Sequence, residues 1–239
     1  MEAYALTDVG QKRSMNQDSV YACTKSIGSL ENLFIVADGM GGHQAGDFAS
    51  NFVVENLVRF FETPYPERDV HGILKEGIRK VNRDLYECTS RDPKLNGAGS
   101  TLVLATIKGS VLYVANIGDS RLYLLREALE QITKDHSYVE ELVAMGKLKR
   151  GSRDYLEKKN IITRAVGVSA QVDTDLFALK LKSGDQILMC SDGLSNMLEE
   201  QQICALLQKP DAAKAVDALI EASLDAGAND NVTAVLISR

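Results

Sequence analysis

Three strand-like runs follow one another in the middle of the chain with almost no sequence between them. They cover residues 100–107, 110–116 and 120–126, and only Lys108-Gly109 and Ile117-Gly118-Asp119 separate them. Short connectors that contain Gly and Asp favour hairpin turns, which join neighbouring antiparallel strands. The sequence therefore predicts that these three runs pair in antiparallel order.

Segments with helical periodicity lie on both sides of these runs. Apolar residues recur at helical spacing over residues 45–61 and 70–88, and again over 199–207 and 211–224. A last strand-like run, Val232–Ser238, closes the chain. Pairs of helices thus alternate with groups of antiparallel strands, and the strands cannot be covered by one another alone. The pattern predicts a layered α+β sandwich.

Aspartates stand at the ends of four strand-like runs. Asp38 and Asp192 each begin an Asp-Gly pair after an apolar run, and each pair is expected to deliver its carboxylate from a buried strand into a turn. Asp119 lies between two of the runs, and Asp230 comes just before the last one. Four such carboxylates are hard to explain as packing. They predict a site of hard oxygen ligands, which suits Mg²⁺ or Mn²⁺.

Composition and charge exclude several classes of function. The formal net charge of −6 argues against general binding to nucleic acid or anionic membranes, and no apolar run is long enough to span a membrane. No basic residue precedes Lys12, so no signal peptide is expected. Disulfides remain possible among the four distant cysteines, but free buried thiols in a reducing cytosol are preferred. We expect one cytoplasmic domain, residues 1–239.

The common catalytic motifs are missing from the sequence, which has no phosphate-binding Gly-Lys-Ser/Thr loop, no His-Glu-x-x-His and no Arg six residues after any cysteine. What remains is water activated by metal ions. Two ions roughly 3.5–4 Å apart can generate a hydroxide and orient an in-line attack on a phosphate ester. Arg13 is the best-placed cation for the phosphate, because Arg can bind it through two parallel hydrogen bonds.

Six short motifs resemble those of the type 2C metal-dependent Ser/Thr protein phosphatases, especially the bacterial stand-alone members. They are Arg13 with Asp18-Ser19, then residues 36–42, 99–101, 116–121, 191–193 and 230–233. No single motif is specific, but six in the family order, over essentially the whole chain, are highly so. The resemblance implies a four-layer α/β/β/α sandwich, in which two antiparallel sheets lie face to face between pairs of helices.

The resemblance also implies a pair of tightly bound Mn²⁺ or Mg²⁺ ions. By position, Asp38 would bridge the two ions and Gly39 would lend its backbone carbonyl. Asp192 and Asp230 would complete the direct ligands, and a hydroxide that bridges the ions would attack the phosphorus atom.

Three further residues receive roles by the same resemblance. Asp18 would act through a metal-bound water, and Arg13 would bind the phosphate of the substrate. Asp119, together with Asp192, would hold a third and weaker ion, as in bacterial members.

Two regions leave parts of the chemistry open. Animal members carry a His directly after the first Asp-Gly as a proposed general acid, but this chain has Met40, so a metal-bound water or His43 would protonate the leaving group. Residues 138–162 fall where the family carries a mobile flap beside the site. The stretch 147–159 is rich in Lys and Arg and would steer acidic phosphopeptides, or it is an ordinary surface loop whose charges do nothing.

The leading hypothesis is a monomeric phosphatase that acts on phosphorylated protein substrates and reverses a cognate Ser/Thr kinase. One alternative is a catalytically weak module that binds phosphoproteins; loss of a core aspartate would favour it, and none is lost. The other is a hydrolase for small phosphate esters, which would share the same metal centre. Activity on a phosphothreonine peptide compared with free phosphometabolites would separate them. The sequence names neither the substrate, nor the physiological metal, nor the kinase.

Overall fold

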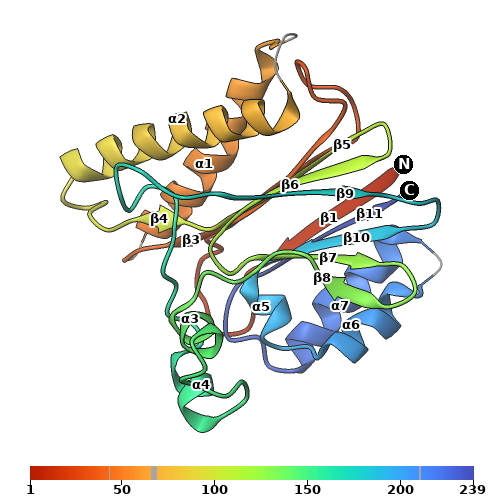
Figure 1. Cartoon of the computed structure of the whole chain (residues 1–239). Helices are drawn as coiled ribbons and strands as arrows, with labels where there is room; N and C mark the ends of the chain where they lie inside the picture. The colour runs from red at the N-terminus through yellow and green to blue at the C-terminus, as the bar shows by residue number, and fades with distance from the viewer. Residues whose placement is uncertain (43, 66–68, 210) are drawn as a thin grey trace.

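The computed structural model of the chain describes residues 1–42, 44–65, 69–209 and 211–239, which form two antiparallel sheets that lie face to face (Figure 1). The first sheet has the strand order β1 (Glu2–Asp8), β11 (Val232–Ser238), β10 (Gln186–Cys190), β7 (Arg121–Leu125) and β8 (Leu129–Gln131). The second has the order β2 (Asp18–Cys23), β3 (Leu33–Met40), β5 (Leu102–Lys108), β6 (Val111–Ile117) and β9 (Asp175–Lys180), with β4 (Gly99–Ser100) paired to β3.

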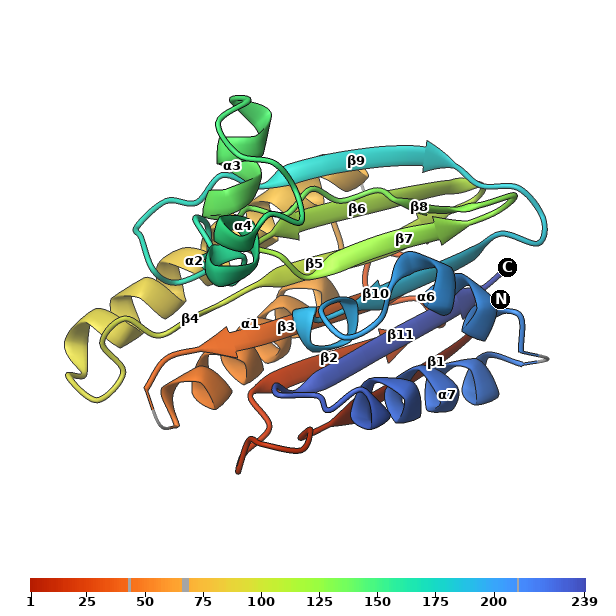
Figure 2. The ribbon, with the colours of Figure 1, turned by 90° about the horizontal axis from the view of Figure 1, so that it is seen from below.

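Helices cover the outer face of each sheet, as Figures 1 and 2 show. α1 (Ala45–Glu62) and α2 (Val70–Arg91) pack on the second sheet, and α6 (Glu200–Leu207) and α7 (Ala212–Asp225) pack on the first. α2 begins after Asp69 and α7 after Asp211, whose carboxylates accept hydrogen bonds from first-turn N–H groups at 2.6 and 2.7 Å. The four-layer α/β/β/α sandwich is therefore confirmed, and the four predicted helices begin and end within three residues of the expected positions.

Alternation along the central strands explains how one chain fills three apolar layers. In β11, Val235 and Ile237 face the space between the sheets, while Ala234 and Leu236 face the helices. β3 does the same in the second sheet, with Phe34 directed inward and Ile35 directed toward α1 and α2. Because both faces of these strands are buried, their sequences are continuous apolar runs.

The predicted pairing of the three central runs is half right. β5 and β6 form the expected hairpin around Gly109, but β6 and β7 do not pair. The connector 118–120 instead crosses from the second sheet to the first, where β7 lies between β10 and β8. Gly118 has a φ of 99°, which serves this crossing as well as it would serve a hairpin. A turn residue therefore predicts a change of direction but not the partner strand.

The two Asp-Gly pairs do not lie in turns, contrary to the prediction. Asp38 and Gly39 are inside β3, and Asp192 and Gly193 begin the short helix α5 (Asp192–Ser195). A Cβ atom at Gly39 would overlap the carbonyl oxygen of Gly46 in α1, and one at Gly193 would overlap that of Asn231. Both glycines allow two backbones to pack closely, rather than allowing a positive φ.

Residues 138–162, predicted as a flap, contain two short helices, α3 (Tyr138–Ala144) and α4 (Arg153–Lys158). This α3–α4 segment protrudes from one end of the sandwich, far from the N- and C-termini (Figure 1). In the described segments, no helix is both long and apolar enough to cross a membrane. All four cysteines lie in described segments as free thiols, and Cys190 alone among them is buried.

Candidate metal centre

Asp18 links the two sheets. It lies directly opposite Asp38 in the pairing of β2 with β3, and it is 7% exposed. Its Oδ2 accepts hydrogen bonds from Ser191 Oγ at 2.7 Å and Thr233 Oγ1 at 2.6 Å. Ser191 directly follows β10 and Thr233 lies in β11, two strands of the opposite sheet. Its Oδ1 is buried and has no hydrogen-bond partner within the described part of the chain. The hydroxyls hold the carboxylate in place and leave one oxygen free.

Asp38 is fixed through its backbone. Its N–H donates to Thr101 Oγ1 at 2.9 Å, and its carbonyl oxygen accepts from the Thr101 N–H at 2.8 Å. The same Thr101 hydroxyl contacts Ser120 Oγ at 2.7 Å, beside Asp119. These contacts set the place of the half-buried Asp38 side chain without neutralising its charge.

Asp192 and Asp230 reach the same place from β10 and β11. Asp192 Oδ2 accepts a hydrogen bond from Asn196 Nδ2 at 2.9 Å, while its buried Oδ1 has no partner among the described residues. Asp230 Oδ2 forms an ion pair with Arg13 Nη2 at 2.8 Å. Arg13 therefore lies at the exposed edge of the aspartates, where the sequence analysis expects the phosphate-binding cation.

The aspartates repel one another. Burial is the largest cause that raises the pKa of Asp38 well above its usual range, and the charges of Asp18, Asp192, Asp119 and Asp230 raise it further. Burial likewise raises the pKa of Asp18 to about 7, of Asp119 to about 8 and of Asp192 to about 6, with charges of other aspartates adding to each. The fold thus brings five predicted site residues together at a cost that a divalent cation would remove.

Asn231 has the structural role that its place beside Asp230 in the sequence suggests. Its side-chain amide donates to the carbonyl oxygens of Val9 and Met15 at 2.8 and 2.9 Å, and its Oδ1 accepts from the Gln17 N–H at 2.8 Å. The residue next to Asp230 therefore shapes the loop that carries Arg13. Thr233 shares this expected structural role, whereas Ser191 and Thr101 were missed as supporting residues. Their only signal is that Ser191 stands next to a predicted ligand and Thr101 lies in the Gly-Ser-Thr motif.

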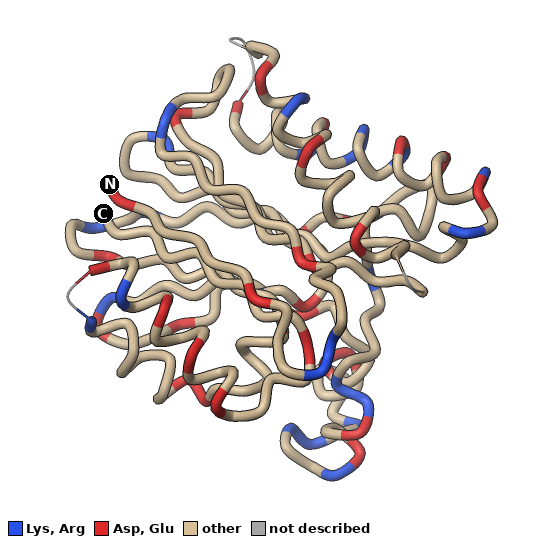
Figure 3. The backbone as a smooth tube through the Cα atoms, turned by 180° about the vertical axis from the view of Figure 1, so that it is seen from behind, with Lys and Arg blue, Asp and Glu red and all other residues tan. Residues whose placement is uncertain are grey.

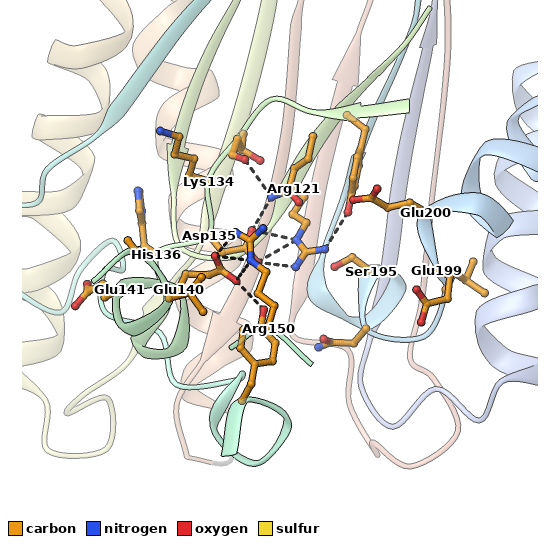
Figure 4. Close-up of a pocket in the computed structure, with 18 of the residues that line it drawn as sticks. Arg121, Lys134, Asp135, His136, Glu140, Glu141, Arg150, Ser195, Glu199 and Glu200 are labelled. Atoms are coloured by element: carbon orange, nitrogen blue, oxygen red, sulfur yellow. Dashed lines mark hydrogen bonds and ion pairs between the residues drawn. The ribbon is translucent and has the colours of Figure 1, made fainter. Parts of the chain in front are cut away.

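A cavity of about 1320 Å³ lies beside the aspartates rather than over them. The α3–α4 segment, residues 131–136 and the start of α6 line it, and Figure 4 shows its charged walls. A space of about 20 Å³ reaches from there to Asp119 and Asp192. Lys159, at the end of α4, donates to Asn196 Oδ1 at 2.8 Å and so connects the segment to Asp192.

The donor set suits Mg²⁺ or Mn²⁺, because these cations prefer carboxylate oxygens. In the described residues, no three His, Cys, Asp or Glu side chains already surround one point closely enough to hold an ion. One oxygen each of Asp18, Asp192 and Asp230 is bonded instead to a hydroxyl, an amide or Arg13. The two unpartnered buried oxygens, Asp18 Oδ1 and Asp192 Oδ1, are the atoms that fit a cation.

Figure 3 shows acidic positions gathered at the end of the sandwich from which the α3–α4 segment protrudes, and basic positions along that segment.

The carbonyl oxygen of Gly39, predicted as a metal ligand, lies against the first turn of α1, because a Cβ atom at Gly46 would lie 2.7 Å from it. His43, the alternative proton donor, lies outside the described residues.

Comparison with known proteins decides the family. The family model for protein phosphatase 2C matches residues 9–236. The chain belongs to the protein phosphatase 2C family. It is 36% identical over 253 residues to the serine/threonine phosphatase stp of Listeria monocytogenes serotype 4b, covering 100% of this chain and 96% of the relative.

Solved structures of phosphatase 2C relatives agree with this assignment. The serine/threonine phosphatase Stp1 from Staphylococcus aureus has a TM-score of 0.92 at 34% identity, covering 100% of this chain and 94% of the relative. The catalytic domain of the serine/threonine protein phosphatase PstP, solved with two manganese ions, has a TM-score of 0.85 at 37% identity, covering 98% and 96%. Phosphatases of the 2C family are metal-dependent, and phosphoproteins are their substrates.

Proposed function

We propose that this chain removes phosphate from phosphoserine and phosphothreonine in proteins, with two Mn²⁺ or Mg²⁺ ions held by Asp38, Gly39, Asp192 and Asp230. The enzyme class follows from the family and from relatives that are named serine/threonine phosphatases over their full length. The ligand assignment rests mainly on one observation. The buried Oδ1 of Asp192 has no hydrogen-bond partner among the described residues, and burial and the charge of Asp230 raise the pKa of this carboxyl to about 6.

Bound ions of this kind supply an activated water and neutralise the charge of the phosphate. The residues of the chain supply the geometry. Ser191 and Thr233 hold Asp18 so that its free Oδ1 faces the site. Arg13 is half-exposed, at 49% of its side chain, and an incoming phosphate would replace Asp230 on its guanidinium group. Asp119 and Asp192 would hold a third and weaker ion.

The competing functions can be separated by substrate. A hydrolase for small esters would turn over free phosphometabolites as well as a phosphothreonine peptide, whereas a protein phosphatase should prefer the peptide. The assay should contain Mn²⁺, with a chelator as the metal-free control. A module that only binds phosphoproteins would bind the peptide and hydrolyse neither substrate, and that outcome would refute the proposal.

Three expectations of the sequence analysis stay predictions. They are the cognate Ser/Thr kinase, the monomeric state and the cytoplasmic location. A pull-down of the kinase, sedimentation at several concentrations and localisation of the tagged chain would test them in turn.

A further inference from the structure

The position of Asp119 depends on the bend just before it. Gly118 has a φ of 99°, and a Cβ atom there would lie 2.7 Å from Thr101 Cγ2. Asp119 itself is 8% exposed, and its carboxylate accepts a hydrogen bond from its own backbone N–H. The direction of this side chain is therefore set by the backbone of residues 118–120, so whatever holds Gly118 also aims Asp119.

His136 holds Gly118 at two points. The His136 N–H donates to the Gly118 carbonyl oxygen at 2.9 Å, and the Gly118 N–H donates to His136 Nδ1 at 3.1 Å. The imidazole is 6% exposed, so these are buried hydrogen bonds without competition from bulk water. Both backbone polar groups of Gly118 are satisfied by this one residue.

The other side of the imidazole fixes the position of its proton. Because Nδ1 accepts from Gly118, the proton of the neutral ring is on Nε2, which lies 3.2 Å from Asp175 Oδ2 and 3.3 Å from Arg164 Nη1. The carboxylate is the acceptor for this proton, because a guanidinium group can only donate. Arg164 Nη1 in turn donates to Asp175 Oδ1 at 3.0 Å. Asp175 therefore holds the ring in the tautomer that leaves Nδ1 free to accept.

The base of the α3–α4 segment meets at the same residue. The His136 carbonyl oxygen accepts from the Thr163 N–H at 2.8 Å, and the Tyr138 N–H donates to the Ile161 carbonyl oxygen at 2.8 Å. The start and the end of the protruding segment are thus joined beside Gly118.

Asp135, the residue next to His136, binds Arg121, which lies two residues after Asp119. Arg121 binds Asp135 through two hydrogen bonds, from Nε to Oδ1 at 3.0 Å and from Nη2 to Oδ2 at 2.7 Å. Figure 4 shows Arg121 and Asp135 directed toward one another, with His136 beside them. Asp135 and His136 therefore contact the residues on both sides of Asp119.

We propose that His136 is a positioning residue, which aims Asp119 through its Nδ1 and connects the α3–α4 segment to this carboxylate. The inference rests on the proposed role of Asp119 at the weaker ion. The task falls to Nδ1, because this nitrogen is the one that accepts from the Gly118 N–H.

Two variants separate the ring nitrogens. The side chain of H136N places an acceptor where Nδ1 lies, whereas that of H136Q places a donor where Nε2 lies and leaves the Gly118 N–H without its acceptor. Both variants keep the backbone hydrogen bond from residue 136 to the Gly118 carbonyl oxygen. The Mn²⁺ concentration for half-maximal phosphopeptide turnover, and the number of bound Mn²⁺ ions counted by electron paramagnetic resonance, should be measured for both. Protection of the Gly118 amide from hydrogen exchange, without metal, is the readout independent of activity.

We expect H136Q to lose the weak ion, with at least about a tenfold higher Mn²⁺ requirement, and to lose Gly118 protection. H136N should stay within about threefold of the wild-type Mn²⁺ requirement. Equal losses in the two variants, a larger loss in H136N, or no loss in either would overturn the inference. The D119A variant separates failure of the proposed third metal site from failure of the proposed contact between His136 and Gly118. If D119A keeps the weak ion, the proposed third site fails, and Gly118 protection still judges the contact with His136.

Discussion

Two groups of acidic residues lie at the same end of the molecule and differ in the charge of their hydrogen-bond partners. In the wall of the large cavity, Asp135 binds Arg121, Asp175 binds Arg164, and Glu140 binds Arg150. At the candidate metal centre, the partners of Asp18 and Asp192 are hydroxyl and amide groups, and Arg13 on Asp230 is the one cation bonded to that centre within the described residues.

The difference appears in the pKa values. Burial alone would raise the pKa of Asp175, but hydrogen bonds and charge from His136 and Arg164 outweigh it and lower that pKa. Burial also opposes ionisation of Glu140, whose pKa is lowered by Arg150 and Tyr155. At the candidate metal centre, hydrogen bonds from Thr233 and Ser191 do not outweigh burial at Asp18, and burial and neighbouring aspartates raise the pKa of Asp38 well above its usual range. The acidic residues of the cavity wall are neutralised by ion pairs within the protein. The buried aspartates of the candidate metal centre would be neutralised by a bound metal ion.

The largest expected effect follows from removing a charge at the centre. Asp38→Asn or Asp192→Ala should lower phosphopeptide turnover with Mn²⁺ at least about a hundredfold, because each removes charge that holds the ions. The matched control is Asp185→Asn, which changes an aspartate with a side chain 1% exposed that pairs with Arg126 on a different part of the sandwich. That control should lower Tm and keep turnover. Comparable turnover in the Asp38 and Asp185 variants would refute the distinction.

Arg13 belongs to the centre by position but carries the opposite charge. Arg13→Ala should lower kcat/KM for phosphopeptide by about 10- to 100-fold, since a bidentate contact to phosphate would be lost. Arg13→Lys should recover only part of it, because Lys cannot form two parallel hydrogen bonds. Steady-state kinetics on both variants checks this, with Mn²⁺ binding measured in parallel. A change in Mn²⁺ affinity larger than the change in kcat/KM would assign Arg13 to the metal rather than to the phosphate.

The repulsion at the centre predicts how stability depends on pH without metal. Folding raises the pKa values of Asp18, Asp192 and Asp119 from 3.8 to about 7, 6 and 8, so the folded state binds more protons than the unfolded state. The stability from these groups is complete below about pH 4 and is lost as pH rises toward 8. Mn²⁺ should therefore raise Tm more at pH 8 than at pH 5.

Asp38→Asn sharpens this test. Without metal at pH 8, the variant should melt higher than wild type, and the difference should narrow as the pH falls toward 4. A gain of about 1 kcal/mol in the free energy of unfolding corresponds to a rise in Tm of about 2–4 °C in a domain of this size. Asp185→Asn should do the reverse, because Arg126 lowers the pKa of Asp185, and its loss should lower Tm at pH 8. If both variants shift Tm in the same direction, the contrast between the two groups is wrong.

The smallest effect is expected on the α3–α4 segment. Arg150 and Arg153 already pair with Glu140 and Glu157, so less free positive charge remains than the sequence suggests. Lys147 and Lys149 form no ion pair with any described residue. Reversing both to Glu should raise KM for acidic phosphopeptides by a few-fold, roughly, and less at high salt, because exposed charges are screened. Turnover of p-nitrophenyl phosphate is the control, and equal effects on both substrates would point to damage at the centre.

Local patterns in the sequence determined much of this protein. Periodicity located α1, α2, α6, α7 and β11, because the burial of one helix face or both strand faces leaves a direct trace in the residue types. The six motifs pointed to the family that the comparisons confirm. Four aspartates of the centre, Asp38, Asp119, Asp192 and Asp230, were likewise visible as carboxylates at strand ends, whereas Asp18 was assigned only by the family resemblance.

Tertiary structure decided which of these pieces meet. Whether Gly118 turns a hairpin or crosses between sheets depends on which surface buries β7, and turn residues do not encode that choice. The hydrogen bonds of Asp18 with Ser191 and Thr233 join residues that are 173 and 215 positions apart. The hydrogen bond between Gly118 and His136 joins the connector between the two sheets to the segment that follows β8. Such contacts depend on how distant parts of the chain pack, which local sequence patterns do not encode. The sequence therefore indicated the proposed ligands, and the tertiary structure determined which groups hold them in place.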